Sequence, residues 1–369
     1  MEIIKVGTDT IIKYESMWDG LSNQATGPGI IHIRNGHITE NSEEQTPASV
    51  LDFSNHTVMP TLMDCHVHLS LPYKSKDTPA DRANNLLQSG IAAVRDAGSR
   101  QSLLHSLPPL TVINTVHAIS KAGYYGANLG TTVENVLEAE QVMNRLADTG
   151  AKQIKLIASG IFSFSCYGDT GPIPFTTNEL TRIVTHAQKQ GLKVMAHATG
   201  NEAVSRCLDA GVDSIEHGYF MTEKTLEKMA KDNVCWIPTL IPAAIHLSSP
   251  QLFSQLSAIQ RGTIRRTLAH QQQLVAKAAE LNVCIGAGSD AGALGVPHGP
   301  SLYWELRELA RCGLSAVTTL KTATSSAARI CDLPDLGTIA PTKKLPLLVV
   351  AQNPLQQMAT LEKPVALLI

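Results

Sequence analysis

The fold of this chain is decided by one stretch, Val58-Met59-Pro60-Thr61-Leu62-Met63-Asp64-Cys65-His66-Val67-His68-Leu69. Its apolar residues are typical of a short strand, and two histidines one residue apart lie near its end. Because side chains at positions i and i+2 of a strand point to the same face, His66 and His68 are expected to project together. A His-x-His pair alone is common by chance. It becomes informative because four later strand-like segments also end in metal-ligand residue types.

Seven further segments have the composition of strands, and helical patterns separate most of them. With the opening stretch they make eight β-α repeats, which predict a parallel sheet closed into a (β/α)8 TIM barrel over residues 58–334. The fold class is therefore α/β, with the chemistry expected at the carboxyl ends of the strands. The further strands are expected at 91–95, 110–114, 153–157, 193–197, 214–217, 234–238 and 283–287.

Both ends of the chain are predicted to be β-structure. Residues 29–38 have the pattern of two short strands around the turn Asn35-Gly36, a strong β-hairpin signal. Further strands are expected at 50–53, 337–339 and 345–350. Since neither end is long enough to form a stable core alone, we predict that residues 1–57 and 335–369 pair into one composite β-sandwich domain.

The composition excludes several classes of protein. A net charge of −2 and 17% charged residues do not favour a nucleic-acid partner or a disordered acidic tail. The amino terminus lacks the pattern of a signal peptide, and no apolar run approaches the roughly 18–20 residues of a membrane span. Seven cysteines, an odd number without regular spacing, are typical of free thiols in a reducing compartment. We therefore predict a cytoplasmic protein with no membrane partner.

Residues that can bind a metal recur at the ends of the predicted strands. Four imidazoles, one carboxylate and one lysine would converge on the mouth of the barrel. Imidazole and carboxylate together are the ligand set for zinc or a similar divalent ion. The candidates are His66, His68, Lys155, His197, His217 and Asp290.

On these motifs the chain resembles the metal-dependent hydrolases of the amidohydrolase superfamily over nearly its whole length. The motifs are His66-Val67-His68, Ile154-Lys155-Leu156, Met195-Ala196-His197-Ala198, Ser214-Ile215-Glu216-His217-Gly218 and Gly288-Ser289-Asp290. Within the superfamily it is most similar to the branch of prolidase-like Xaa-Pro dipeptidases and imidazolonepropionase-related enzymes. That similarity rests on the segments 211–218, 236–240, 297–299 and 322–329.

The resemblance implies two divalent metal ions, with zinc the first expectation. It assigns His66 and His68 to one ion, with Asp290 as a further ligand. It assigns His197 and His217 to the other, and gives Lys155 the bridging role as a carbamate formed with CO2. The alternatives are a lysine whose ammonium reaches solvent from a strand end and histidines that are only hydrogen-bonded in the core.

The reaction implied by this resemblance is hydrolysis of a C–N bond in a small-molecule amide, linear or cyclic. A metal-activated hydroxide would attack the carbonyl, and Asp290 would shuttle the proton to the leaving nitrogen. Three alternatives stay open. They are a mononuclear deaminase-like hydrolase with Lys155 unmodified, a non-hydrolytic isomerase or lyase, and a catalytically silent binding protein.

Specificity is expected to depend on residues around the mouth. Arg95 fits a substrate contact and a structural ion pair equally well. Where prolidase-like relatives often carry Gly-Gly-His, this chain has Gly123-Tyr124-Tyr125-Gly126, and the tyrosine expected after 238–240 is absent. Both departures concern recognition of a substrate carboxylate. The helical surface over 255–280 could pair two copies in a homo-oligomer or face solvent. The candidate substrate residues are Arg95, His117, Tyr124, Tyr125, Tyr167 and His298.

Overall fold

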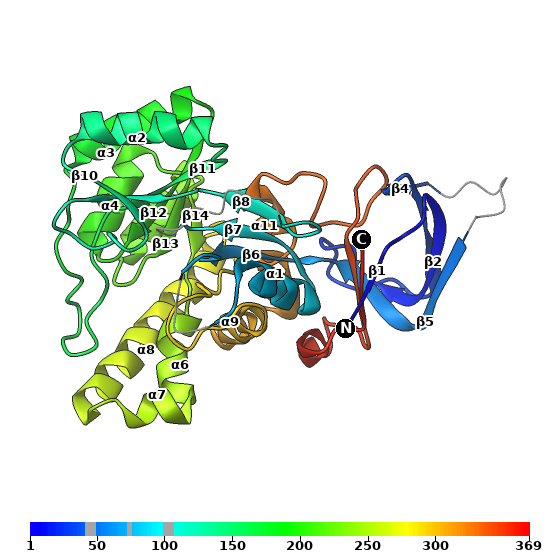
Figure 1. The fold of residues 1–369 in the computed structure, drawn as a ribbon. Coiled ribbons are helices and arrows are strands. Elements are labelled where there is room, and N and C mark those ends of the chain that lie inside the picture. Colours follow the sequence, from blue (N-terminus) through cyan, green and yellow to red (C-terminus); the bar gives the residue numbers. More distant parts are fainter. Residues whose placement is uncertain (41–48, 72–75, 99–106) are drawn as a thin grey trace.

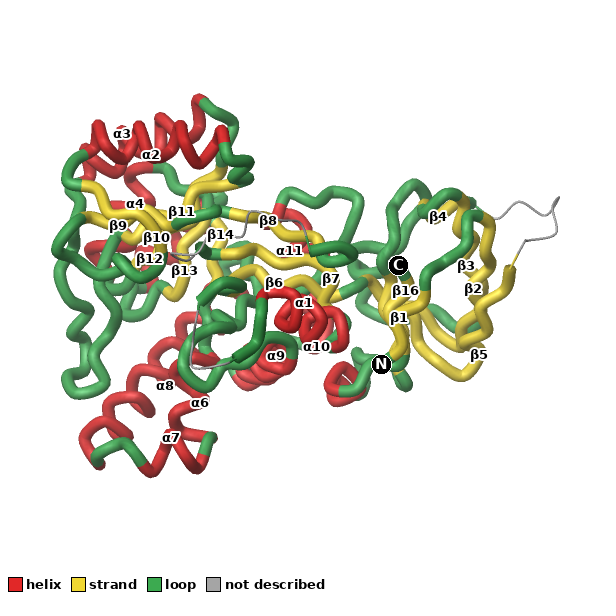
Figure 2. The backbone as a smooth tube through the Cα atoms, in the orientation of Figure 1, coloured by secondary structure: helices red, strands yellow, loops and turns green. Residues whose placement is uncertain are grey.

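The computed structural model in Figure 1 describes residues 1–40, 49–71, 76–98 and 107–369. Within these residues the fold is α/β, with one seven-stranded sheet, one six-stranded sheet and one three-stranded sheet. Helices pack beside the two smaller sheets, as Figure 2 shows for α2 and α3 above the strands of the six-stranded sheet. None of the helices in the described residues has the length and apolar character needed to cross a bilayer.

The seven-stranded sheet contains strands from both ends of the chain, and the two termini lie close to it in Figure 1. The hairpin around Asn35-Gly36 is confirmed, and both of its turn residues have positive φ. In sheet order the strands are β1 (Glu2–Ile4), β16 (Ala366–Leu368), β15 (Leu347–Val350), β5 (Ser49–Pro60), β2 (Asp9–Met17), β3 (Gly29–Arg34) and β4 (His37–Thr39).

The prediction of a strand at 337–339 is wrong. Gly337 has a φ of 80°, and a Cβ at this position would lie 2.7 Å from the carbonyl oxygen of Thr324. The chain therefore turns tightly against its neighbour here, in a conformation that an extended strand does not allow. Ile339 donates its backbone N–H to the carbonyl of Asp19 instead of joining a sheet.

The two smaller sheets are entirely parallel and contain the predicted strands between 62 and 237. The first begins at Leu62, since residues 58–60 belong to β5, and His68 follows its end. The three-stranded sheet has β6 (Leu62–Val67), β7 (Ile91–Asp96) and β8 (Thr111–Asn114). The six-stranded sheet has β10 (Gly130–Val133), β9 (Ala118–Lys121), β11 (Gln153–Ile157), β12 (Lys193–Ala198), β13 (Ser214–His217) and β14 (Cys235–Ile237).

Most helices begin at a side-chain cap that the sequence provides. Thr176 and Glu179 form a reciprocal capping box at the start of α3, which satisfies backbone N–H groups that have no partner within the helix. The helices are α1 (Pro79–Gln88), α2 (Val136–Asp148), α3 (Thr177–Lys189), α4 (Asn201–Ala210), α5 (Glu223–Asp232), α6 (Ile241–Ser248), α7 (Pro250–Ser254), α8 (Ala258–Glu280), α9 (Pro300–Arg311), α10 (Ala316–Thr322) and α11 (Ser325–Cys331), with a 3-10 turn, η1 (Met358–Glu362).

The eighth strand, expected at 283–287, is not a regular strand. Ile285 forms only an isolated parallel bridge with Trp236. The segment is closely packed at its end, because a Cβ on Gly288 would lie 2.4 Å from the side chain of Ile237, and the chain then turns at Asp290, which has a φ of 54°. The segment is nevertheless hydrogen-bonded on both sides, with Trp236 N–H donating to the Cys284 carbonyl and Cys65 N–H to the Ala287 carbonyl.

Hydrogen bonds also join the parallel sheets on their other side. The backbone N–H of Lys152, directly before β11, donates to the carbonyl of Asn114 at the end of β8 at 2.8 Å. The three-stranded sheet is thus connected to the six-stranded sheet at both of its edges. This arrangement brings the ends of β6, β11, β12 and β13 toward one region (Figure 1).

Candidate metal centre

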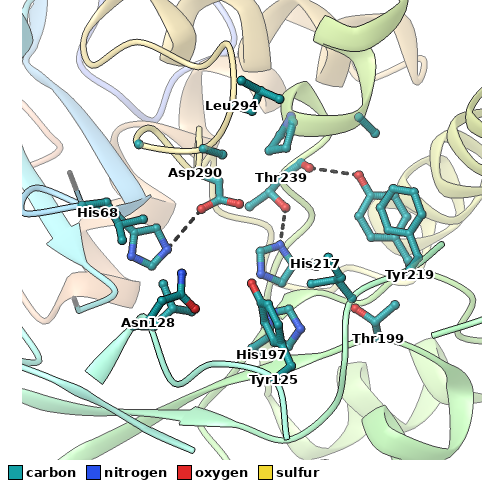
Figure 3. Close-up of a pocket in the computed structure, with 18 of the residues that line it drawn as sticks. His68, Tyr125, Asn128, His197, Thr199, His217, Tyr219, Thr239, Asp290 and Leu294 are labelled. Atoms are coloured by element: carbon teal, nitrogen blue, oxygen red, sulfur yellow. Dashed lines mark hydrogen bonds and ion pairs between the residues drawn. The ribbon is translucent and has the colours of Figure 1, made fainter. Parts of the chain in front are cut away.

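The predicted metal ligands meet at the carboxyl ends of the parallel strands. The imidazole of His66 has ring-centroid distances of 5.4 Å to His68 and 5.1 Å to His217. His197 and His217 lie 4.6 Å apart by the same measure. Figure 3 shows His68, Asp290, His217 and His197 around one cavity. The sequence prediction that these side chains converge is consistent with this geometry.

Two of the histidines are oriented by hydrogen bonds through Nδ1. His66 Nδ1–H donates to the carboxylate of Glu216 at 2.6 Å, and His68 Nδ1–H donates to the carbonyl of Gly98 at 2.6 Å. A proton fixed on Nδ1 leaves the lone pair of Nε2 free in a neutral imidazole. This pattern, in which the second nitrogen is held by a carboxylate or carbonyl, is typical of histidines that bind metals.

The other two histidines are held in a similar way. His197 donates from Nε2 to the carbonyl of Gly160 at 3.0 Å, which leaves Nδ1 as its free nitrogen. His217 Nδ1 shares a hydrogen bond of 2.6 Å with the hydroxyl of Thr239. Each of the four imidazoles therefore uses one nitrogen for orientation and has the other available as a ligand.

The backbone of His217 is held in an uncommon conformation. Its φ is 67°, which is strained for a residue with a side chain. Its carbonyl accepts hydrogen bonds from Trp236 Nε1 at 3.0 Å and from Gln271 Nε2 at 2.5 Å. These two side chains stabilise the conformation that points the imidazole toward its neighbours.

The charges of the cluster suit a cation. Burial lowers the pKa of His66 to about 4 and that of His197 to about 3, so both are neutral near pH 7. Burial also lowers the pKa of Lys155 to about 8, which leaves a fraction of its amine unprotonated at neutral pH. Lys155 Nζ lies 3.5 Å from His66 Nε2.

Asp290 supplies the carboxylate. Its Oδ1 lies 3.3 Å from His68 Nε2 and 3.5 Å from His66 Nε2. Burial acts to raise the pKa of Asp290, but the imidazoles of His66 and His68 outweigh it and hold this pKa below its ordinary value. Potential ligand atoms of His66, His217 and Asp290 all lie within 4.8 Å of one another. Neutral imidazoles around an ionised carboxylate fit a divalent metal ion.

Glu216 supports the cluster and was missed as a functional residue in the sequence. It is fully buried, and its second oxygen pairs with Arg95 Nη2 at 2.6 Å. Burial opposes ionisation, yet Arg95 lowers the pKa of Glu216 to about 2. Arg95 also donates from Nε to the carbonyl of Cys65 at 2.7 Å. The structure thus places Arg95 in the ion pair that the sequence left open, beneath the histidines. The sequence signal that could have identified Glu216 is a carboxylic acid within an otherwise apolar strand.

A second buried carboxylate, Asp64, connects β6 to the segment that carries Asp290. It accepts hydrogen bonds from the backbone N–H of Ser289 at 2.9 Å and of His66 at 3.1 Å. The Ser289 hydroxyl donates to it at 2.5 Å. Its contribution is positional, since it holds strand β6, which presents His66, against the segment that presents Asp290.

A cavity of about 380 Å³ lies over these ligands. Among the predicted substrate residues that the structure describes, Tyr125 lines it, with its ring 5.2 Å from that of His197. Tyr124 is exposed, and Tyr167 lies against the guanidinium of Arg266 at 3.7 Å. His298 donates to the carbonyl of His68 from outside the cavity, and His117 lies between β8 and β9, also away from the lining.

The remaining residues of the cavity wall were not named individually from the sequence. Most of them come from loops after the strands, whose course no periodic pattern predicts, and His246 comes from α6. They include Asn128, Phe162, Phe164, Thr199, Tyr219, Thr239, His246 and Leu294. Thr239 belongs to the segment 236–240 quoted in the sequence, and Phe162 and Phe164 belong to the loop 159–174, which the sequence is expected to place over the mouth.

Comparison with known proteins gives this geometry a family. The model of the amidohydrolase family matches residues 57–368. An uncharacterized protein of Mycobacterium tuberculosis is 27% identical over 327 residues, which cover 85% of this chain and 84% of that protein.

Two solved structures share the fold. A Xaa-Pro dipeptidase with bound methionine has a TM-score of 0.81 and 24% identity, covering 97% of this chain and 98% of the other. The ochratoxinase of Aspergillus niger has a TM-score of 0.81 and 22% identity, covering 98% and 93%. These neighbours match the prolidase-like branch that the motifs indicate. The chain therefore belongs to the amidohydrolase family, and it is a hydrolase that acts on carbon–nitrogen bonds.

Proposed function

We propose that the protein hydrolyses a small-molecule amide, linear or cyclic, at a pair of divalent metal ions. The observation that carries the proposal is the orientation of four imidazoles, each held through one nitrogen, around Lys155 and Asp290. The family generally uses divalent metals, which supports this interpretation. The names of two relatives, a Xaa-Pro dipeptidase and an ochratoxinase, support an amide as the substrate.

The proposed ligand sets follow the positions of the side chains. His66, His68 and Asp290 would hold one ion, and His197 and His217 the other, with zinc as the expected metal. Lys155, converted to a carbamate by CO2, would bridge them. A buried ammonium beside two cations would be strongly unfavourable, whereas a carbamate offers anionic oxygens. The lowered pKa of Lys155 supports this because only the unprotonated amine reacts with CO2.

When bound, the ions would supply Lewis acidity that acidifies a water and polarises the amide carbonyl. The reaction adds one water across the C–N bond and gives a carboxylic acid and an amine. Asp290 would take the water's proton at a carboxylate oxygen and deliver it to the leaving nitrogen. Its side chain retains 16% exposure and lines the cavity, so it can reach both groups.

We also infer the larger architecture from the backbone hydrogen bonds. The connections of β14 and β6 to segment 284–291, and of β8 to Lys152, support a closed (β/α)8 barrel over residues 58–334. The shared seven-stranded sheet supports a composite β-sandwich domain of residues 1–57 and 335–369. A cytoplasmic location and a homo-oligomer stay predictions.

The test compares the wild type with Asp290→Asn, both loaded with zinc and assayed against a panel of amides, dipeptides and lactams. We expect metal-dependent release of an amine by the wild type. We expect Asp290→Asn to retain most of its metal and lose activity by a factor on the order of 10³. Full activity of this variant would contradict the proton shuttle, and no hydrolysis by the metal-loaded wild type would contradict the proposed function.

A further inference from the structure

One side of the cavity is formed by four rings in contact, which we call the aromatic wall: Phe162, Phe164, Tyr219 and His246. The ring centroids of Phe162 and Tyr219 are 4.5 Å apart. Phe162 and Phe164 are 5.5 Å apart, and Phe164 meets His246 edge-on at 4.8 Å. All four residues line the same cavity as the metal ligands. Figure 3 shows Tyr219 on the other side of His217 from His68.

The aromatic wall offers its rings to the cavity, because the hydroxyl of Tyr219, its one phenolic group, already has a hydrogen-bond partner in the protein. The Tyr219 hydroxyl donates to the carbonyl of Thr239 at 3.1 Å and is buried. Thr239 in turn bonds His217 through its own hydroxyl (Figure 3). The wall is therefore fixed directly beside a predicted metal ligand, and a group that packs on it lies next to the reacting bond.

The rim of the same cavity is also apolar and exposed. The side chains of Ile161 and Leu294 are 55% and 39% exposed, although both are large and hydrophobic. They come from different loops, one after β11 and the other after Asp290, and both line this cavity. Apolar surface gathered at a concave site favours an apolar ligand, because covering it removes it from water.

We propose that the substrate carries a ring-bearing apolar group, on the acyl or the amine side of the scissile bond, which packs against the aromatic wall. Aromatic pairs prefer offset or edge-on contacts of the kind the wall already makes within itself. This proposal rests on the proposed function, since it names the substrate class of that site. Phe162 is its central residue because it contacts both Phe164 and Tyr219.

The experiment uses two matched pairs of amides with zinc-loaded enzyme. One pair is a 3-phenylpropanamide and a propanamide of the same amine, and the other is a phenethylamide and an ethylamide of the same acid. We expect kcat/KM to favour the ring-bearing member by at least about tenfold in one pair. Phe162→Ala should reduce that preference to below about threefold.

The control variant is Phe253→Ala. Phe253 is a half-buried phenylalanine of α7, which packs on Arg261 and lies outside the described lining of the cavity. The Phe253→Ala variant should retain the wild-type preference for the ring-bearing amide. Hydrolysis of both members at equal rates, or a full preference in Phe162→Ala, would overturn the proposal and leave the proposed function intact.

Absence of hydrolysis in both pairs would instead count against the proposed function. In that case, binding of the same amides, measured by calorimetry, tests whether the aromatic wall binds a ring-bearing group. Tighter binding of the ring-bearing member by wild type and by Phe253→Ala, but not by Phe162→Ala, would uphold it. Equal binding of both members by the wild type would overturn it.

Discussion

The two sides of the cavity are held together by different kinds of interaction. On the side of the ligands, polar groups are buried and each histidine is fixed by a directional hydrogen bond. On the side of the aromatic wall, Phe162 and Phe164 are half-buried and contact other rings without such bonds. The first side comes largely from strands, and the second from loops and α6.

This difference separates chemistry from recognition. A metal ligand must be held within narrow limits of distance and angle, and strands with second hydrogen bonds provide that rigidity. An apolar group is recognised by area, which loops can change without disturbing the ligands. We therefore expect that each side of the cavity can be altered largely independently of the other.

The largest expected effect comes from removing the metal. Treatment with a chelator should lower kcat/KM for an amide by a factor on the order of 10³ or more. Binding of a ring-bearing amide should weaken by less than about threefold, since the aromatic wall is untouched. Kinetics and calorimetry, with zinc added back as the control, measure the two effects. Equal losses of activity and binding would show that the two sides are not separate.

The next effect is on stability against pH in the metal-free protein. His66 and His197 have folded-state pKa values of about 4 and about 3, below the value of about 6.5 in an unfolded chain. Between the folded-state pKa of each histidine and about pH 6.5, the unfolded state therefore binds more protons than the folded state. The free energy of unfolding consequently falls as the pH is lowered from about 6.5. Each histidine contributes about 1.4 kcal/mol per pH unit in that window.

Urea unfolding at several pH values between 7 and 5 measures this slope. His197→Asn should reduce the slope by about one histidine's share, that is about 1.4 kcal/mol per pH unit. A free energy of unfolding that is independent of pH over this range would contradict the burial of neutral imidazoles in the cluster.

A smaller effect is expected from Thr239→Val, which removes the hydrogen bond to His217 Nδ1 and keeps the shape of the side chain. The affinity for zinc should fall about tenfold, because the imidazole loses its orientation. Thr199→Val is the matched control: Thr199 is buried in the same cavity and bonds Ser159 through its backbone nitrogen. Competition with a chromogenic chelator measures both, and equal affinities would refute the role of Thr239.

The smallest effect is expected from Tyr219→Phe. The variant keeps the ring of the aromatic wall and loses the hydrogen bond to the Thr239 carbonyl. Stability to urea should fall by about 1 kcal/mol, and the preference for ring-bearing amides should stay within about twofold of the wild type. A loss of preference as large as that in Phe162→Ala would mean that the hydroxyl, rather than the ring, recognises the substrate.

The ligand residues could be predicted from the sequence because two simple rules locate them. Alternation along a strand places His66 and His68 on one face, and parallel strands bring their carboxyl ends together. Even the irregular eighth segment kept Asp290 beside His66, since backbone hydrogen bonds hold it although it forms no regular strand.

The supporting residues and the specificity residues could not be predicted in the same way. Gln271 lies on α8, 54 positions from the carbonyl it bonds, and nothing in its local sequence indicates that contact. Tyr167 and Tyr125 both lie in loops, yet one packs on Arg266 and the other lines the cavity. Such contacts depend on tertiary packing and not on local periodicity.

The proposed site is a pair of divalent ions bridged by a modified Lys155, and the metal content per chain is its decisive measurement. Wild type and Lys155→Ala are purified without chelator, and their metal content per chain is measured by mass spectrometry of the elements. We expect about two ions per chain in the wild type and about one or fewer in the variant. About one ion in both proteins would contradict the bridged pair and favour a mononuclear, deaminase-like site.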